Sequence, residues 1–324
     1  MNELLKMEDV RVNFYTYKGT VQALDNINFD IKKGECLGLV GETGCGKSVS
    51  ALSIMNLISP PGKIISGKIF LDGEGDLLRK TEEEMRKIRG DKISMIFQDP
   101  TSSLNPVLKV DDQISEVLIH HRGMTKVQAY DKTIEILELV GIPSPESRAK
   151  DYPHLLSGGM KQRIMIALAM VCEPQLLIAD EPTTNLDVTV QLQILDLMKE
   201  LQRKYNTAIL LITHNLGIVS ENCDRVGVMY AGQMVEVAQT KQIFRKPEHP
   251  YTIGLLNAIP RIDQKREWLP VIQGMVPGLI NPPAGCRFID RCEFAMEKCN
   301  IKPKLEKLEE NHFRACYKEV EKIK

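Results

Sequence analysis

The stretch that decides the fold is Gly41-Glu42-Thr43-Gly44-Cys45-Gly46-Lys47-Ser48, which matches the phosphate-loop template G-x-x-x-x-G-K-[ST]. It follows the apolar run Cys36–Val40, which predicts a buried strand, and it precedes a mostly apolar run over 49–57 with helical spacing. In this context the glycines allow backbone N–H groups to point at phosphate oxygens, and the helix N-terminus adds a partial positive charge. We therefore expect Lys47 to reach the β- and γ-phosphates of a nucleotide and Ser48 to bind Mg²⁺.

Length and charge limit the classes of protein to consider. At 324 residues the chain is long enough for two domains, or for one α/β domain with an appendage. Lys and Arg number 42 and Asp and Glu number 43, so the net charge is close to zero. This balance supplies no general attraction to nucleic acid or to an anionic membrane surface.

The apolar runs are too short for a membrane-spanning helix. The run over 164–172 is one of the longest, and a bilayer requires about 20 apolar residues. The N-terminus, Met1-Asn2-Glu3-Leu4-Leu5-Lys6, lacks the basic and then apolar layout of a secretory signal. We therefore expect a cytosolic protein that is not an integral membrane protein, with cysteines that are mostly free, metal-bound or catalytic.

Short alternating pieces over 7–40 predict an antiparallel meander that leads into the loop, and residues 64–72 predict a further strand pair. Tyr15 and Tyr17 lie at the edge of the meander, where either ring has the chemistry to stack on adenine. Stretches over 107–143 predict helices, and residues 226–230 with 234–237 predict a hairpin.

Three later stretches place polar groups where a parallel sheet binds its ligands. Gln98 ends the apolar strand that begins at Ile93, and His214 ends the strand that begins at Ala208. The run Leu176–Ala179 terminates in Asp180 and Glu181, as expected for a strand buried on both faces. We expect Asp180 to hold Mg²⁺ through water and Glu181 to polarise the water that attacks the γ-phosphate.

The run Leu156-Ser157-Gly158-Gly159-Met160-Lys161-Gln162-Arg163 predicts a second helix N-terminus that meets an anion, with Ser157 as the N-cap. Taken in order with Asn185-Leu186-Asp187 and the motifs above, this set resembles the nucleotide-binding subunits of ABC transporters. The stretches 97–100, 103–106 and 249–252 are similar to the dipeptide and oligopeptide importer branch, which includes nickel importers. Asn185 and Asn215 depart from the family pattern, in which a small residue and Asp are common.

The resemblance implies a P-loop NTPase (RecA-like) α/β core with an antiparallel β subdomain, a helical subdomain and a small Cys-rich tail. Residues 1–98 and 165–240 would form the nucleotide-binding core, 99–164 the helical signature subdomain, and 241–324 the C-terminal extension. The residues expected at ATP are Tyr17, Gly41, Glu42, Thr43, Gly44, Cys45, Gly46, Lys47, Ser48, Ser50 and Gln98. Those expected at Mg²⁺ are Ser48, Gln98 and Asp180, and those expected in catalysis are Glu181, His214, Gln98 and Lys47.

The resemblance also implies partners and a mechanism. Two ATPase subunits would form a head-to-tail dimer in which Ser157, Gly158, Gly159 and Met160 complete the partner's ATP site, beside the D-loop Asn185, Leu186 and Asp187. ATP-driven closure of this dimer would drive two transmembrane permease subunits at the cytoplasmic face of the membrane, supplied by an extracytoplasmic binding protein. A heterodimer is favoured over a homodimer, and no nucleic acid partner is expected.

Two alternatives remain for the function. The first alternative is an importer ATPase whose transporter carries nickel or another small solute. It stays open because the specificity for cargo belongs largely to the membrane subunits. A soluble ABC-type ATPase that acts on nucleic acid or ribosomes is the alternative from a different class. Such proteins generally carry two cassettes or long coiled insertions, whereas this chain has one cassette and no basic excess.

Four of the eight cysteines cluster near the C-terminus with the spacing C-x5-C-x6-C-x16-C, namely Cys286, Cys292, Cys299 and Cys316. The gaps are wider than the C-x2-4-C knuckles of structural zinc sites, whereas an iron–sulfur cluster tolerates wider loops. The importer branch has members with a four-iron four-sulfur cluster in this tail, which favours the cluster over zinc, disulfides or free thiols. The other cysteines, Cys36, Cys45, Cys172 and Cys223, are expected to fill apolar space.

Overall fold

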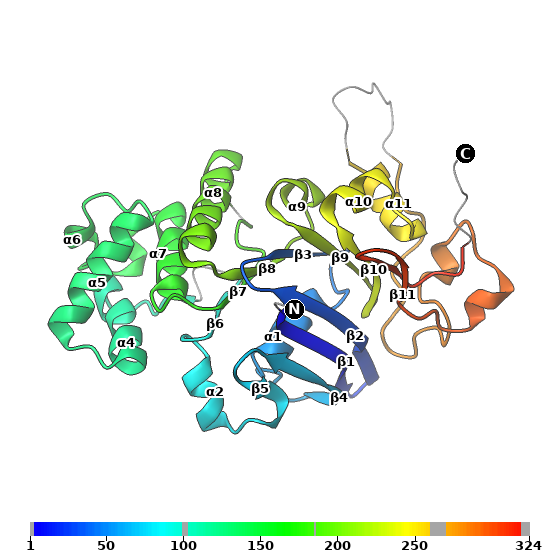
Figure 1. Ribbon diagram of the computed structural model, residues 1–324, viewed down its shortest axis with the longest axis horizontal. Helices are drawn as coiled ribbons and strands as arrows, with labels where there is room; N and C mark the ends of the chain where they lie inside the picture. The colour runs from blue at the N-terminus through cyan, green and yellow to red at the C-terminus, as the bar shows by residue number, and fades with distance from the viewer. Residues whose placement is uncertain (1–2, 99–102, 185, 260–269, 319–324) are drawn as a thin grey trace. The chain divides into compact units, whose positions relative to one another are not determined.

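The computed structural model describes residues 3–98, 103–184, 186–259 and 270–318. The chain divides into two compact units. The first unit comprises Met1–Leu4, Ile31–Glu35 and Arg79–Ile212, and the second comprises Leu5–Asp30, Cys36–Leu78 and Thr213–Lys324. Figure 1 labels the helices and strands of both units.

The first unit contains three parallel strands in the order β6–β7–β8, and their bounds are β6 Ile93–Ile96, β7 Leu176–Asp180 and β8 Ala208–Ile212. The pairing runs from Ile93 beside Leu176 to Asp180 beside Ile212. All residues of β7 and β8 are buried, as the continuous apolar runs predict for strands of a parallel sheet. This register brings the end of β7, with its carboxylates, next to the end of β8.

Helices make up most of the rest of the first unit: α2 Glu82–Ile88, α4 Val110–Arg122, α5 Lys126–Leu139, α6 Pro145–Arg148, η2 Pro153–Leu155, α7 Gly158–Met170 and α8 Val188–Tyr205. Capping boxes start two of them, because Thr81 and Glu84 at α2 and Thr125 and Gln128 at α5 satisfy each other's backbone N–H groups. Figure 1 shows α4, α5 and α7 packed together, in agreement with the helices predicted over 107–143.

The second unit carries an antiparallel sheet in the order β2–β1–β4–β5, with bounds β1 Glu3–Thr16, β2 Gly19–Lys32, β4 Gly62–Leu71 and β5 Gly75–Asp76. The predicted meander is confirmed for its first two strands, β1 and β2, which are neighbours in this sheet, and is wrong for Cys36–Val40, which belongs to the other sheet. The strand pair predicted over 64–72 is wrong, because these residues form the single strand β4, which pairs with β1 on one side and β5 on the other. The pairing of β1 with β4 is irregular near Gly67. A Cβ added at Gly67 would lie 2.5 Å from Val10 Cα, so the two strands approach each other there at a distance that only glycine permits.

The other strands of the second unit follow the order β11–β12–β10–β9–β3, and their bounds are β3 Cys36–Val40, β9 Arg225–Tyr230, β10 Gln233–Gln239, β11 Glu306–Glu309 and β12 His312–Arg314. The predicted hairpin is confirmed as β9 and β10, whose turn residues Ala231 and Gly232 both have positive φ (46° and 81°). The C-terminal tail is therefore not a detached appendage, since β12 pairs with β10.

Short helices complete the second unit: α1 Lys47–Ile54, α9 Leu216–Asn222, α10 Thr240–Arg245, α11 Pro250–Asn257, η3 Ile289–Arg291 and η4 Glu297–Asn300, while η1 spans Leu77–Arg79. Among the described residues, the helices are all too short or too polar to cross a lipid bilayer.

A buried carboxylate ties the tail to this sheet. Glu236, in β10, is fully buried and accepts hydrogen bonds from the backbone N–H groups of Glu248 (2.8 Å) and His249 (3.0 Å), and it lies 2.8 Å from Nε2 of His312 in β12. Burial by itself raises the pKa of Glu236, but the hydrogen bonds from His312 and the backbone outweigh it and hold the pKa below its ordinary value of 4.5.

Replacing Glu236 by glutamine should lower the free energy of unfolding at pH 7 by about 2 kcal/mol, the usual range for hydrogen bonds to a charged group. A carboxyl with a depressed pKa adds stability above the unfolded-state pKa and loses it as the pH falls through the folded-state pKa. The difference between the two proteins should therefore shrink below pH 4.5. Urea unfolding followed by circular dichroism from pH 7 downward measures it. Glu309→Gln, on the surface of β11, should change stability little, and equal losses for Glu236→Gln at every pH would contradict the assignment.

Candidate nucleotide site and cysteine pocket

The phosphate loop connects β3 to α1 in the second unit. Gly41 (φ 152°) and Gly46 (φ 105°) have backbone conformations that residues with side chains rarely adopt. A Cβ at Gly41 would lie 2.2 Å from the carbonyl oxygen of Met229, and one at Gly46 would lie 2.8 Å from that of Ala23. The strand, loop and helix predicted around this motif are confirmed, and the glycines are required by the close packing of the loop.

Lys47 closes the loop on itself. Its ammonium donates to the carbonyl oxygens of Gly41 (2.7 Å) and Glu42 (3.2 Å), and the side chain is buried. Thr43, Gly44 and Ser48 are exposed, so the outer side of the loop and the first turn of α1 are open to solvent. Because Gly46 is the N-cap, no capping side chain competes with an anion for the first N–H groups of α1.

The other residues predicted to contact the nucleotide differ in exposure. Ser50 is fully buried and its hydroxyl donates to the carbonyl oxygen of Gly46 (3.1 Å), so it supports the loop from within the helix. Tyr15 lies in β1 and Tyr17 in the turn that follows, with 51% and 93% of their surfaces exposed. Cys45 is buried, and burial raises the pKa of its thiol.

The first unit brings Gln98 and Glu181 together at the end of β7. The side-chain amide of Gln98 donates to Glu181 Oε2 (3.1 Å), and the hydroxyl of Thr184 donates to the same oxygen (3.0 Å). Glu181 has φ 47°, in the left-handed region, and its N–H donates to the carbonyl oxygen of Ile212 (2.9 Å). Thr184 was missed by the sequence reasoning, although its position three residues after Glu181, across Pro182, is a local signal of such a contact.

Asp180 is the last residue of β7 and is buried. His214 and Asn215 follow β8 and are exposed. Asn215 is the N-cap of α9, and its side-chain oxygen accepts from the N–H groups of Gly217 (2.9 Å) and Ile218 (3.4 Å). The amide thus fills the capping role that the usual Asp would fill.

The signature run starts α7 as predicted. Ser157 is the N-cap, with its hydroxyl oxygen accepting from the N–H of Met160 (3.3 Å), and both Ser157 and Gly158 are exposed. Asp187 caps α8 in the same way, through Val190 N–H (2.9 Å), and Leu186 precedes it. Asn185 and the 99–100 part of the importer-like stretch lie outside the described residues.

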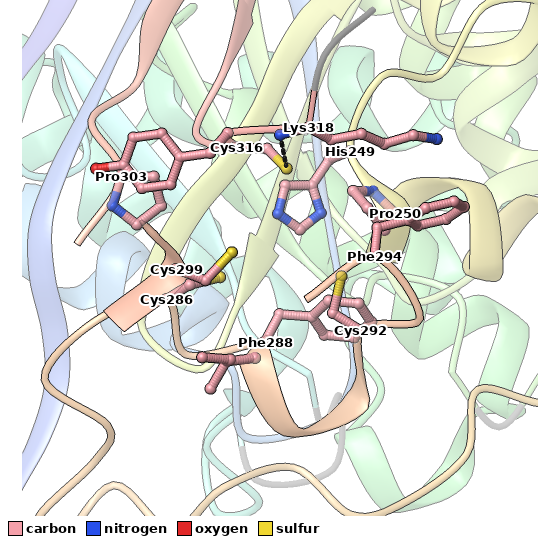
Figure 2. Close-up of a pocket in the computed structure, with 12 residues that line it drawn as sticks. His249, Pro250, Cys286, Phe288, Cys292, Phe294, Cys299, Pro303, Cys316 and Lys318 are labelled. Atoms are coloured by element: carbon pink, nitrogen blue, oxygen red, sulfur yellow. Dashed lines mark hydrogen bonds between the residues drawn. The ribbon is translucent and has the colours of Figure 1, made fainter. Parts of the chain in front are cut away.

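The C-terminal cysteines line one pocket in the second unit. Figure 2 shows Cys286, Cys292, Cys299 and Cys316 around this pocket together with His249 and Phe288. The N–H of Cys286 donates to the carbonyl oxygen of Cys299 (2.8 Å), and Cys316 Sγ accepts from the N–H of Lys318 (3.4 Å). Burial raises the pKa of Cys286 to about 11, and the neighbouring thiols add to the shift.

The pocket brings together four thiol groups, but their positions do not match the arrangement of a metal site. All four thiols are free, and within the described ranges no group of three or more His, Cys, Asp or Glu side chains is arranged to hold an ion. The remaining cysteines are buried, as expected for apolar filler. Cys36 and Cys223, far apart in sequence, nevertheless lie with their sulfurs 3.4 Å apart.

Two protein-family models match this chain, one toward its N-terminus and one toward its C-terminus. A family model described as "ABC transporter" matches residues 24–184, and one described as "Oligopeptide/dipeptide transporter, C-terminal region" matches residues 235–299. The oligopeptide transport ATP-binding protein OppD of Salmonella typhimurium is 48% identical over 322 residues, 99% of this chain and 96% of that protein. The dipeptide transport ATP-binding protein DppD of Bacillus subtilis is 52% identical over 301 residues, 93% of this chain and 90% of that protein.

Solved structures agree with this similarity. The dimeric structure of the ATP-binding cassette MJ0796 in a post-hydrolysis state, bound to ADP and Pi, matches with a TM-score of 0.66 and 27% identity. The match covers 73% of this chain and 99% of that one. CbiO1 from Clostridium perfringens, part of the transporter complex CbiONQ, matches with a TM-score of 0.65 and 29% identity over 79% of this chain and 96% of its own.

Proposed function

The chain belongs to the ABC transporter family of ATPases, in the branch with the oligopeptide/dipeptide C-terminal region, and from this premise we propose that it hydrolyses ATP to power peptide import. The observation that carries the proposal is the sequence identity of 48% to OppD and 52% to DppD over 99% and 93% of this chain. The matched lengths include the tail as well as the cassette. The same observation favours an importer over a soluble ATPase acting on nucleic acid or ribosomes, and peptides over nickel or another small solute.

In this proposal the loop residues 41–48 bind the triphosphate of ATP, with Lys47 at the β- and γ-phosphates and Tyr17 or Tyr15 beneath the adenine. Ser48, Gln98 and Asp180 hold Mg²⁺, whose charge offsets that of the phosphates. Glu181 accepts a proton from the attacking water, and the hydrogen bonds from Gln98 and Thr184 fix the direction of its carboxylate. His214 donates a hydrogen bond to the γ-phosphate.

We also infer the assembly from the relatives. The dimeric state of MJ0796 supports a head-to-tail pair in which Ser157, Gly158, Gly159 and Met160 act on the partner's ATP, next to the D-loop 185–187. The exposed helix N-terminus at Ser157 is compatible with that role. A related ATPase subunit is the proposed partner, with two permease subunits, a peripheral place on the cytoplasmic face of the membrane, and an extracytoplasmic binding protein. The division of the chain into 1–98 with 165–240, 99–164 and 241–324 is part of this proposal.

Reconstitution tests the import proposal. The chain should co-purify with a pair of peptide-permease subunits, and vesicles containing the complex should accumulate a labelled dipeptide only when MgATP is supplied on the side that this chain faces. Unlabelled peptide should compete, and Ni²⁺ should not. ATPase stimulation by ribosomes or DNA, together with failure to associate with permease subunits, would overturn the proposal.

We further propose that Cys286, Cys292, Cys299 and Cys316 ligate a four-iron four-sulfur cluster, with zinc as the alternative. Thiolates are the soft ligands that iron–sulfur clusters and zinc both prefer, and the four thiols line a single pocket. Because the side chains as placed do not form a finished site, ligation requires local rearrangement, which couples metal binding to the folding of the tail. Deleting 280–324 and measuring uptake would reveal whether the tail is needed for transport.

Protein purified without oxygen should contain about four iron and four sulfide per chain, the content of one such cluster. Cys292→Ser should lower both contents and the visible absorption, because one ligand is lost. Cys172→Ala, which removes a buried thiol from the first unit, should leave both unchanged. Zinc in place of iron would select the alternative, and protein without metal would contradict both.

A further inference from the structure

The cysteine-bearing tail contacts the phosphate loop directly through one side chain. Arg291, the residue before Cys292, donates from Nη1 to Glu42 Oε2 (2.8 Å) and from Nη2 to Glu42 Oε1 (3.0 Å). Two parallel bonds between a guanidinium and a carboxylate fix both distance and orientation, which a lysine could not do. Glu42 is the second residue of the loop, so the tail holds the loop at its start.

The guanidinium itself is held from several sides. Nε donates to the carbonyl oxygen of Gln273 (2.9 Å), Nη2 to that of Ile272 (3.2 Å), and Nη1 to the hydroxyl of Tyr230 (3.2 Å). The group also lies over the rings of Tyr230 and Phe288. Only 5% of the Arg291 side chain is exposed, compared with 28% for Glu42. The arginine is therefore a fixed support, and the carboxylate it holds is the more accessible partner.

The backbone of Glu42 is fixed as well. Its N–H donates to the hydroxyl of Tyr251 (2.9 Å), and its carbonyl oxygen accepts from Lys47 Nζ (3.2 Å). Burial raises the pKa of Tyr251, so the phenol stays protonated. Glu42 thus joins the tail, through Arg291, to the lysine that the proposed ATP site depends on.

A second arginine, also adjacent to a cysteine, supports the surroundings of the loop. Arg287, which follows Cys286, donates to the carbonyl oxygens of Ala231 and Gln22. The neighbouring Gly232 donates its N–H to the carbonyl oxygen of Cys45 in the loop (2.9 Å). Arg287 is buried and reaches the loop only through the Ala231-Gly232 turn, whereas Arg291 contacts the side chain of Glu42 directly.

From this geometry we propose that Arg291 is a positioning residue for the nucleotide, supplied by the tail to hold the phosphate loop through Glu42. The inference rests on the proposed ATP-binding function of the loop. Arg291 acts in two ways: it fixes the loop before ATP arrives, which lowers the cost of ordering, and it neutralises a carboxylate that would otherwise face the phosphates. Both effects concern binding, so KM for ATP should depend on Arg291 much more than kcat does.

The test compares the full-length wild type with Arg291→Ala, Arg291→Lys, Glu42→Gln and the double variant Glu42→Gln/Arg291→Ala. Kd for a fluorescent ATP analogue, mant-ATP with Mg²⁺, should rise about tenfold in Arg291→Ala, a usual size for coupling between neighbouring groups. Kd for Arg291→Lys should lie between those of the wild type and Arg291→Ala, because lysine keeps the positive charge but cannot form the two parallel hydrogen bonds to the carboxylate. KM for ATP should rise in parallel with Kd, while kcat changes less than twofold by the same reasoning.

The double variant separates positioning from a general loss of structure. Removing the carboxylate together with the arginine leaves no unpaired charge beside the phosphates, so the double variant should bind more tightly than Arg291→Ala alone. Lys302→Ala is the matched control, because Lys302 joins the tail to Asp25 (2.6 Å) without touching the loop, and it should leave Kd unchanged.

The outcomes are distinct for the inference and for the function it rests on. A wild type that neither binds nor hydrolyses ATP would overturn the proposed function. An active wild type whose Kd is the same as that of Arg291→Ala would overturn the inference alone. Additive losses in the double variant, or a loss in Lys302→Ala as large as in Arg291→Ala, would reduce Arg291 to a structural tie and would also overturn it.

Discussion

Replacing Glu181 by glutamine should lower the rate of ATP hydrolysis by about 10²–10⁴-fold, the usual contribution of a general base. The amide has nearly the shape of the carboxylate, and its oxygen still accepts the hydrogen bonds from Gln98 and Thr184. It cannot take a proton from water, so the substrate should stay bound. Phosphate release at saturating ATP measures the loss, and mant-ATP titration measures the retained affinity.

Glu200→Gln is the control for this change, because it makes the same substitution at an exposed position of α8. Its hydrolysis rate should equal that of the wild type. Rapid turnover by Glu181→Gln would remove Glu181 from the mechanism. A variant that also fails to bind ATP would mean that Glu181 supports the site and does not act on the water.

Replacing Lys47 by alanine should raise Kd for MgATP at least about 30-fold, because truncating one member of a buried charged pair typically costs 2 kcal/mol or more. The ammonium is buried and bonded to the carbonyl oxygens of Gly41 and Glu42, which places its charge inside the loop. Without it, the phosphates of MgATP would meet the carbonyl oxygens of Gly41 and Glu42 without the ammonium between them. Equilibrium binding of mant-ATP gives the number directly.

Lys63→Ala, at an exposed position of β4, controls for the loss of one positive charge and should bind normally. The two large effects differ in kind, since Lys47→Ala should lose binding and Glu181→Gln should lose turnover. Normal affinity in Lys47→Ala would contradict the proposed role of the loop.

The parts of the fold predicted from sequence are those whose causes are local. The turn at Ala231-Gly232, the N-cap Ser157 and the buried strand β7 each follow from a few adjacent residues. The phosphate loop belongs to the same class as far as its strand, loop and helix are concerned, because these follow from adjacent residues. The close contacts that require Gly41 and Gly46 come from the distant residues Met229 and Ala23.

The parts that sequence did not predict depend on distant partners. Arg291 and Glu42 are 249 residues apart, and neither has a local pattern that names the other. The strands β11 and β12 are short, and β11 is mostly exposed and polar, so periodicity gives no signal. β12 forms on the edge that β10 offers, and β11 in turn pairs with β12. For β4 the length of the run was clear, but a single strand with two neighbours was mistaken for two strands.

The left-handed backbone at Glu181 has a consequence for protein engineering. A residue with a side chain in that conformation costs roughly 1–2 kcal/mol, a cost that glycine avoids. A search for heat-resistant variants that scored folding alone would therefore favour glycine at position 181, which would remove the carboxylate proposed to accept a proton from the attacking water. Directed evolution of this chain for stability therefore needs an activity screen as well, because selection for folding alone would not retain Glu181.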